Sequence, residues 1–243
     1  MKKSFILMVV ICGSIASHAF GRDLGVLVLP IHQGKWTSSL LYEYLKVSED
    51  FDNRGRVDFK SHAVGSQFGY GITDQIAVAV KVAVLVDPQE DAQGSQWQSR
   101  SGYLYGVDLY NEVFPATGYR PGIQLSVGAT GFQVPLDRLI SGNTVTTIDQ
   151  RVSGVEYHGA VLATLRLKRL TPYAGLRSFG SSATWRDNRP EAGATDGISG
   201  HAHGNLSIVA GLPVQVTPDV RIQMEGRFLY ETAATVGFTI ASF

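Results

Sequence analysis

The chain has 243 residues, with 21 basic and 21 acidic side chains and a single cysteine, Cys12. This balance gives no electrostatic basis for binding nucleic acid, and one cysteine cannot form an intramolecular disulfide. After the N-terminal segment there is no run of about 18 apolar residues, so the sequence predicts no membrane-spanning helix.

The N-terminus has the features of a secretory signal peptide. The basic pair Lys2-Lys3 precedes an apolar run, and Ser17-His18-Ala19 offers small residues at the two positions that a signal peptidase reads. We therefore expect residues 1–19 to be a signal peptide cleaved after Ala19, and residues 20–243 to form a single exported domain.

Cys12 raises one alternative at this end, a lipoprotein in which this residue carries the lipid. The bulky Ile11 precedes it where a lipoprotein signal needs a small residue. After cleavage at Ala19 the mature chain has no cysteine, which excludes a thiol nucleophile and a thiolate metal site.

The segment 75–86 alternates with a period of two residues. Its even positions, from Ile76 to Val86, are all isoleucine or valine, and its odd positions are small, polar or single larger residues. Successive side chains of a strand point to opposite faces, so one face here is a continuous β-branched surface. The same two-faced pattern returns at 103–112, 155–167 and 220–230. Behind an export signal, this repetition predicts an antiparallel transmembrane β-barrel with lipid outside and a polar lumen.

We expect an all-β barrel of ten strands, with eight or twelve as alternatives. The expected strands are 36–50, 57–71, 75–86, 102–114, 121–134, 154–167, 171–183, 203–215, 219–231 and 233–243. The first of these is ambiguous, because Leu40 to Leu45 could also form a helix.

The expected connections alternate between short and long. The short ones are 72–74, 115–120, 168–170 and 217–219, and the long polar ones are 87–101, 135–153 and 184–202. Short periplasmic turns and long outer loops are typical of bacterial outer-membrane barrels. We expect Trp97 and Trp185 to lie in the long loops, among polar residues. The outer connections at 51–56 and near 231–232 are expected to be short.

The C-terminal strand ends in Phe243, after Gly237-Phe238-Thr239-Ile240. With the alternating strands, this ending resembles the small Gram-negative outer-membrane β-barrel proteins. The resemblance implies residence in the bacterial outer membrane, contact with its lipid and lipopolysaccharide, and recognition of Phe243 by the barrel-assembly machinery. The segment 68–75 also resembles a strand–turn–strand of outer-membrane transporters of the phenol meta-pathway type, which implies passive transport of small solutes. We expect no cofactor.

The inward faces of the expected strands carry charges of both signs. The candidate luminal residues are Lys81, Asp108, Glu112, Glu156, His158, Arg166, Arg177, Arg221, Glu225 and Arg227. The lumen of a ten-stranded barrel is narrow, and an isolated buried charge is costly, so these side chains should pair. They would form either an ion-pair network that fills the barrel or a narrow polar conduit.

Two other groups of residues are candidates for metal binding or catalysis. His201 and His203 share one face of a strand and could bind a metal, although two ligands do not complete a site. Ser153, Glu156 and His158 suggest a hydrolase, but Ser153 and His158 have opposite parity and should point to opposite faces. The sequence therefore favours a non-enzymatic barrel with a transport, structural or surface-interaction role. The alternative is a surface enzyme acting on lipid or peptide.

Overall fold

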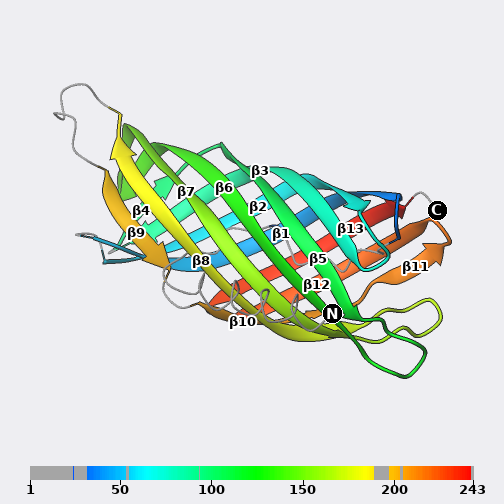
Figure 1. Ribbon diagram of the computed structural model, residues 1–243. Coiled ribbons are helices and arrows are strands. Elements are labelled where there is room, and N and C mark those ends of the chain that lie inside the picture. Colours follow the sequence, from blue (N-terminus) through cyan, green and yellow to red (C-terminus); the bar gives the residue numbers. More distant parts are fainter. Residues whose placement is uncertain are drawn as a thin grey trace.

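The computed structural model describes residue 24 and residues 32–52, 55–92, 94–188, 197–202 and 205–241. Within these residues the chain forms one antiparallel sheet that closes into a slanted barrel (Figure 1). The ring contains ten strands, which confirms the predicted fold class. The expected signal peptide, Cys12, His203 and Phe243 lie outside the described residues.

The ring follows the order of the chain and closes where β13 pairs with β1. Its strands are β1 (Trp36–Phe51), β2 (Gly55–Gly71), β3 (Ile76–Ala92), β5 (Ser101–Phe114), β6 (Gly122–Ser141), β7 (Thr144–Thr164), β8 (Tyr173–Asp187), β10 (Leu206–Gly211), β12 (Val220–Leu229) and β13 (Glu231–Ala241). Three short strands join it: β4 (Ser95–Gln98), β9 (Ile198–Ala202) and β11 (Val214–Thr217).

The ambiguous first segment is a strand. β1 pairs with β13 on one edge and with β2 on the other, and its side chains alternate between the two faces. Leu40 is 60% exposed on the outward face, whereas Leu41 is 1% exposed inside. The pairing on both edges makes this segment a strand, and local sequence preferences alone could not show that pairing.

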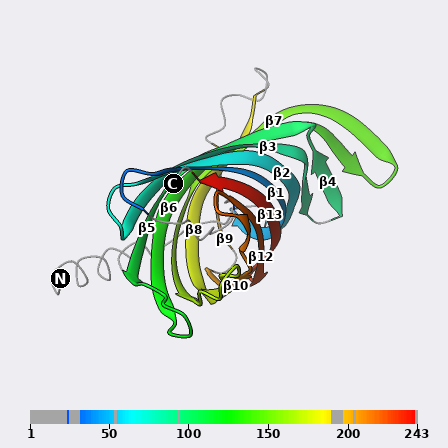
Figure 2. The same cartoon turned by 90° about the vertical axis from the view of Figure 1, so that its right-hand side faces the viewer.

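The long connections are mostly strand, which corrects the expectation of loops at 87–101 and 135–153. β6 has 20 residues and β7 has 21, whereas a tilted strand needs about 9–11 residues to cross a membrane. These strands therefore continue well past the membrane at one end of the barrel, called here the long-hairpin end. Figure 2 shows β4 and the end of β7 projecting from the ring. The connections near 73, 117, 169 and 218 lie together at the opposite, short-turn end.

One side of the wall is short. β10, β12 and β13 end below the level reached by β1 and β8, and β9 pairs with both of those strands in their place. The expected single strand 203–215 is interrupted at Leu212 and Pro213, which separate β10 from β11. At the β12–β13 connection Leu229 and Tyr230 are exposed, at 60% and 50%, whereas the Glu231 side chain at the start of β13 is only 1% exposed.

The outward face carries an apolar belt. Val80, Val82 and Val84 of β3 are about half exposed, at 52%, 54% and 52%, and Tyr103, Tyr105 and other large apolar side chains continue the belt around the ring. These positions match the predicted lipid-facing parity. No described segment forms a helix long and apolar enough to cross a membrane.

Candidate functional site

The barrel interior is filled differently at different levels. At the long-hairpin end, buried apolar side chains from most of the wall form one cluster, called here the apolar layer. Its largest members are Phe51, Phe59, Trp97, Phe132 and Trp185. The Trp97 and Trp185 rings meet edge to face with their centroids 5.1 Å apart, and Phe51 packs against Trp185 at 5.5 Å.

The positions of Trp97 and Trp185 correct the expectation that both lie in polar loops. They are 9% and 2% exposed, and both point into the barrel. The reason is a reversal of pattern along the extended strands. Inside the membrane the outward side must be apolar, but beyond it the outward side meets water, so the apolar residues turn inward as in a soluble protein.

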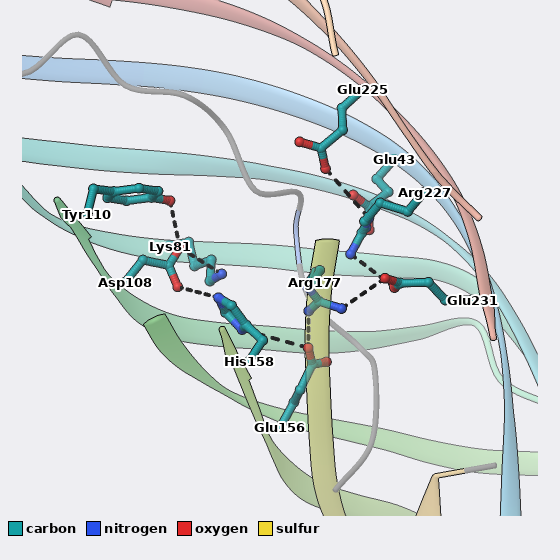
Figure 3. Close-up of polar contacts among 10 residues, drawn as sticks. All are labelled: Glu43, Lys81, Asp108, Tyr110, Glu156, His158, Arg177, Glu225, Arg227 and Glu231. Carbon is teal, nitrogen blue, oxygen red and sulfur yellow. Dashed lines mark hydrogen bonds and ion pairs between the residues drawn. The ribbon is translucent and has the colours of Figure 1, made fainter. Parts of the chain in front are cut away.

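A layer of buried charges adjoins the apolar layer: on β1 the buried Glu43 lies between Leu41 and Leu45 of that layer. Figure 3 shows the charged residues. In the first part of the charged layer, Asp108 of β5 accepts contacts from three neighbours. Lys81 Nζ is 2.9 Å from Oδ2, His158 Nε2 is 3.1 Å from Oδ1, and the Tyr110 hydroxyl donates to Oδ2 at 2.9 Å. Lys81 and Asp108 are each 1% exposed, so this pair is shielded from water.

The second part of the charged layer continues through Glu156. His158 Nδ1 lies 3.7 Å from Glu156 Oε1, and Arg177 donates to the same carboxylate oxygen. Arg177 Nη1 also donates to Glu231 Oε1 at 2.9 Å. Arg227 then joins Glu231 at 3.2 Å. The contacts therefore run without a break from β3 to β12 and across the lumen.

In the last part of the charged layer, Arg227 contacts three carboxylates. Besides Glu231, its guanidinium contacts Glu43 Oε1 at 2.6 Å and Glu225 Oε1 at 3.6 Å. The Thr235 hydroxyl donates to Glu43 at 2.5 Å. Three carboxylates around one guanidinium form a dense charged cluster in which each ion has a partner, as a buried charge requires.

Wall glycines make room for this layer. A Cβ at Gly128 on β6 would lie 2.0 Å from Asp108 Oδ1 and 2.7 Å from the His158 ring. A Cβ at Gly106 on β5 would lie 2.9 Å from Lys81 Cε. Only glycine lets the ion pairs lie against the wall at these two points.

The structure places the sequence candidates at different depths. Those buried in the charged layer are Lys81, Asp108, Glu156, His158, Arg177, Glu225 and Arg227. Three others lie nearer the short-turn end. Arg166 and Glu112 form a pair at 3.7 Å, in which the Arg166 side chain is 56% exposed and that of Glu112 is 17% exposed, and Arg221 is half-buried.

Sequence reasoning missed Glu43 and Glu231. Glu43 lies in the segment that could also be a helix, and Glu231 was assigned to a short connection. Strand parity would have found Glu43 once β1 was accepted, because it alternates with the outward residues Tyr42 and Tyr44. The signal for Glu231 is weaker, because it begins β13 directly after the exposed Leu229 and Tyr230.

The remaining candidates are not assembled. Ser153 and His158 face opposite sides of β7, as their parity predicts. His201 is exposed on β9, and its expected partner His203 lies outside the described residues. Within the part of the chain that the structure describes, no three His, Cys, Asp or Glu side chains are grouped to hold a metal ion.

Between the charged layer and the Arg166–Glu112 pair, the interior is lined by polar uncharged side chains. The hydroxyls of Ser39 and Thr239 lie 2.7 Å apart, and Gln223 donates to Thr239 at 3.0 Å. Gln67 donates to the Tyr110 hydroxyl at 2.8 Å, which links this polar level to the charged layer.

No protein-family model matches the sequence, and no curated protein is similar to it in sequence. The structure is similar to the outer-membrane protease OmpT from Escherichia coli, with a TM-score of 0.51 and 8% identity over 89% of this chain and 97% of that chain. It also matches the outer-membrane protein OprG from Pseudomonas aeruginosa (TM-score 0.46, 10% identity, 88% and 99% covered). A third match is the COG4313 outer membrane channel from Pseudomonas putida F1 (0.44, 10%, 91% and 100%).

The chain folds as an outer-membrane β-barrel. At such low identity the likeness to OmpT shows the fold alone. The outward apolar belt agrees with it, because a closed barrel with a lipid-facing belt satisfies its backbone hydrogen bonds inside a membrane. The predicted location in the bacterial outer membrane follows from this fold.

Proposed function

We propose that this protein is an occluded outer-membrane barrel with a non-enzymatic role at the cell surface, and that its lumen is not an open diffusion path at rest. The observation that carries the proposal is the double filling of the interior. The apolar layer spans the long-hairpin end, and the charged layer lies next to it.

The size of the ring supports this proposal. Barrels of eight strands are filled by side chains, whereas those of sixteen or more leave an aqueous channel. Ten strands leave little room, and here the room is taken by large side chains, including Trp185, Arg177 and Arg227, that are fully buried. A hydrated solute would have to displace aromatic rings and also separate paired charges.

The surface role is supported by the long hairpins. About half of β6 and β7 extends beyond the length needed to cross a membrane. The tip from Ser141 to Thr147 is exposed on both faces. Such a stiff ribbon on a rigid barrel is suited to presenting a surface to other molecules, as loops on a fixed scaffold do.

Passive transport of small solutes is the second candidate. The polar level at the short-turn end favours it, because Ser39, Gln67 and Gln223 could hydrate a solute path up to the charged layer. Transport would then require the apolar layer to move. A surface enzyme has less support, since Ser153 and His158 point to opposite faces and His201 is exposed without an assembled site.

Solute uptake by proteoliposomes separates these functions. The purified barrel is reconstituted, and swelling is measured in isosmotic sugars and amino acids, with empty liposomes and a known porin as controls. We expect swelling no faster than that of empty liposomes. Swelling whose rate falls with increasing solute size would show an open pore and contradict the proposal.

A further inference from the structure

Neighbouring strands lose their regular geometry at a single level of the wall. The β2–β3 register shifts at Lys60–His62, and the β6–β7 register shifts at Leu136–Arg138. Between them, Asp87 of β3 has a positive φ of 47°, and Ser99–Arg100 interrupts the path from β4 to β5. Bulges re-aim side chains, and strained residues persist where the surrounding structure holds them, often at functional sites.

The irregular residues open a cavity on the outward surface. Its volume is about 160 Å³, and we call it the notch; its lining residues are Asp87, Gln89, Gln98, Ser99, Arg100, Asp137 and Arg138. A second cavity of about 250 Å³, which Tyr44 and His62 help to line, shares Asp87 and Gln89 with the notch. The two cavities are therefore adjacent; together we call them the hollow, which lies over β1, β2, β3, β4 and β6.

The hollow lies at the polar edge of the apolar belt. Val86, which precedes Asp87, is paired with Ser101 and His62 and is the last outward valine of β3. Beyond it, Lys60 and Asp91 form an outward ion pair at 2.6 Å. The hydrogen bond to Asp91 raises the pKa of Lys60, which favours the charged form of the lysine. We expect lipid headgroups at this level, because outward apolar side chains give way here to charged ones.

The notch contains two guanidinium groups that are available to an anion. Arg100 and Arg138 are both exposed, and neither makes an ion pair with another residue in the described part of the chain. The planar fork of an arginine side chain binds phosphate oxygens in a bidentate manner, and two of them are typical of phosphate recognition.

The other lining residues restrict the chemical class of the ligand further. Asp87 and Asp137 would repel a bare anion, but carboxylates accept hydrogen bonds from hydroxyl groups, and Gln89 and Gln98 can both donate and accept. A phosphate beside several hydroxyls meets both requirements. An amphiphile fits both the polar lining and the apolar surface beside it, because Val86, the last outward valine of β3, directly precedes Asp87.

We infer that the notch binds the phosphorylated sugar headgroup of a glycolipid. Its phosphate would contact Arg100 and Arg138, its hydroxyls would contact Asp87, Asp137 and the glutamines, and its acyl chains would lie along the apolar belt. The inference goes beyond the proposed function, since it involves the outer surface and holds whether the lumen is open or closed.

Binding to purified protein in detergent tests this inference. The probe is a diglucosamine glycolipid with both phosphates, compared with its dephosphorylated form and with phosphatidylethanolamine. We expect the phosphorylated glycolipid to bind the wild-type protein most tightly. The double variant Arg100→Ala with Arg138→Ala should bind it at least about tenfold more weakly, since each arginine contributes a charge-assisted hydrogen bond. The matched control is Arg120→Ala with Arg169→Ala, which removes two exposed arginines at the short-turn end and should bind like wild type.

Three results would overturn the inference. The first is unchanged affinity in the folded double variant, with folding checked by heat-modifiable gel mobility. The second is equal binding of the phosphorylated and dephosphorylated glycolipids to the wild-type protein, a comparison that needs no variant. The third is equal binding of phosphatidylethanolamine, which would show a general phospholipid contact and no recognition of a phosphorylated sugar.

Discussion

Arg177 on β8 and Glu231 on β13 meet across the interior, with Nη1 2.9 Å from Oε1, although β10 and β12 separate their strands in the wall. Both side chains are fully buried. This contact links the short side of the wall to the long side, so the charged layer connects opposite strands as well as occupying the interior.

Removing one member of this pair should destabilise the barrel. Arg177→Met leaves Glu231 and Glu156 with one cation fewer in a buried site, and we expect a loss of about 3–5 kcal/mol in the free energy of unfolding. Combining it with Glu231→Met should restore part of the loss, with a coupling of about 0.5–3 kcal/mol. Urea unfolding in lipid vesicles measures both. Strictly additive losses would show that the two side chains do not interact.

A single methyl group on the wall should disturb the same layer. Gly128→Ala places a Cβ 2.0 Å from Asp108 Oδ1, which forces the Lys81–Asp108–His158 contacts to shift and should cost about 1–3 kcal/mol. Ala129→Val is the control, because it adds volume at the next residue on the lipid side. Thermal melting of the two variants should differ clearly, and equal melting temperatures would mean that the wall has space at Gly128.

Two exposed valines test the membrane belt. Val82 is 54% exposed within the belt, and Val145 is 64% exposed on the long hairpin beyond it. Val82→Arg should cost about 2–4 kcal/mol because a cation would face lipid near the midplane, whereas Val145→Arg would face water at little cost. The yield of heat-modifiable folded protein measures the difference. Equal yields would place both residues in the same environment.

The orientation in the membrane remains a prediction from the alternation of short and long connections. On the predicted cleavage the mature chain has no cysteine, so introduced thiols are unique. A cysteine at Asn143, in the turn of the long hairpin, should react with an impermeant reagent on intact cells, and one at Asp74, at the short-turn end, should not. The reverse labelling pattern would invert the barrel.

The parts that were predicted from the sequence depend on one rule, the alternation of side chains along a strand. It placed Val80 outside and Asp108 inside because both lie where lipid and lumen impose opposite demands. Past the membrane the same alternation continues, but water replaces lipid on the outward side and the apolar side chains point inward. There the polar residues around Trp97 and Trp185 indicated loops, although they are the solvent face of continuing strands.

The pairing partners inside the barrel could not be predicted for a different reason. Contacts such as Arg227 with Glu43 join strands that are not neighbours in the wall, so they depend on the shear of the whole ring and on which residues share a level. The notch could not be predicted from the sequence either. Its residues come together because irregularities in separate strand pairs lie at the same level of the barrel, and the sequence of one strand does not show this.

The apolar layer changes what a single charge substitution should do. Arg227→Ala leaves Glu43, Glu225 and Glu231 with less compensation and should lower stability. It should not open the barrel by itself, because the Phe51, Trp97 and Trp185 rings remain in place. Planar-bilayer recordings of this variant should therefore resemble those of wild type, and a steady current would show that the charged layer alone closes the lumen.

Single-channel conductance of wild type against the double variant Trp97→Ala with Trp185→Ala tests the occluded barrel most directly. Trp36→Ala, which removes a lipid-facing ring that is 59% exposed, is the control. We predict no steady conductance for wild type and for the control, and discrete openings for the double variant because the largest rings of the apolar layer are gone. A steadily conducting wild-type barrel, or a folded double variant that stays as closed as wild type, would contradict the account.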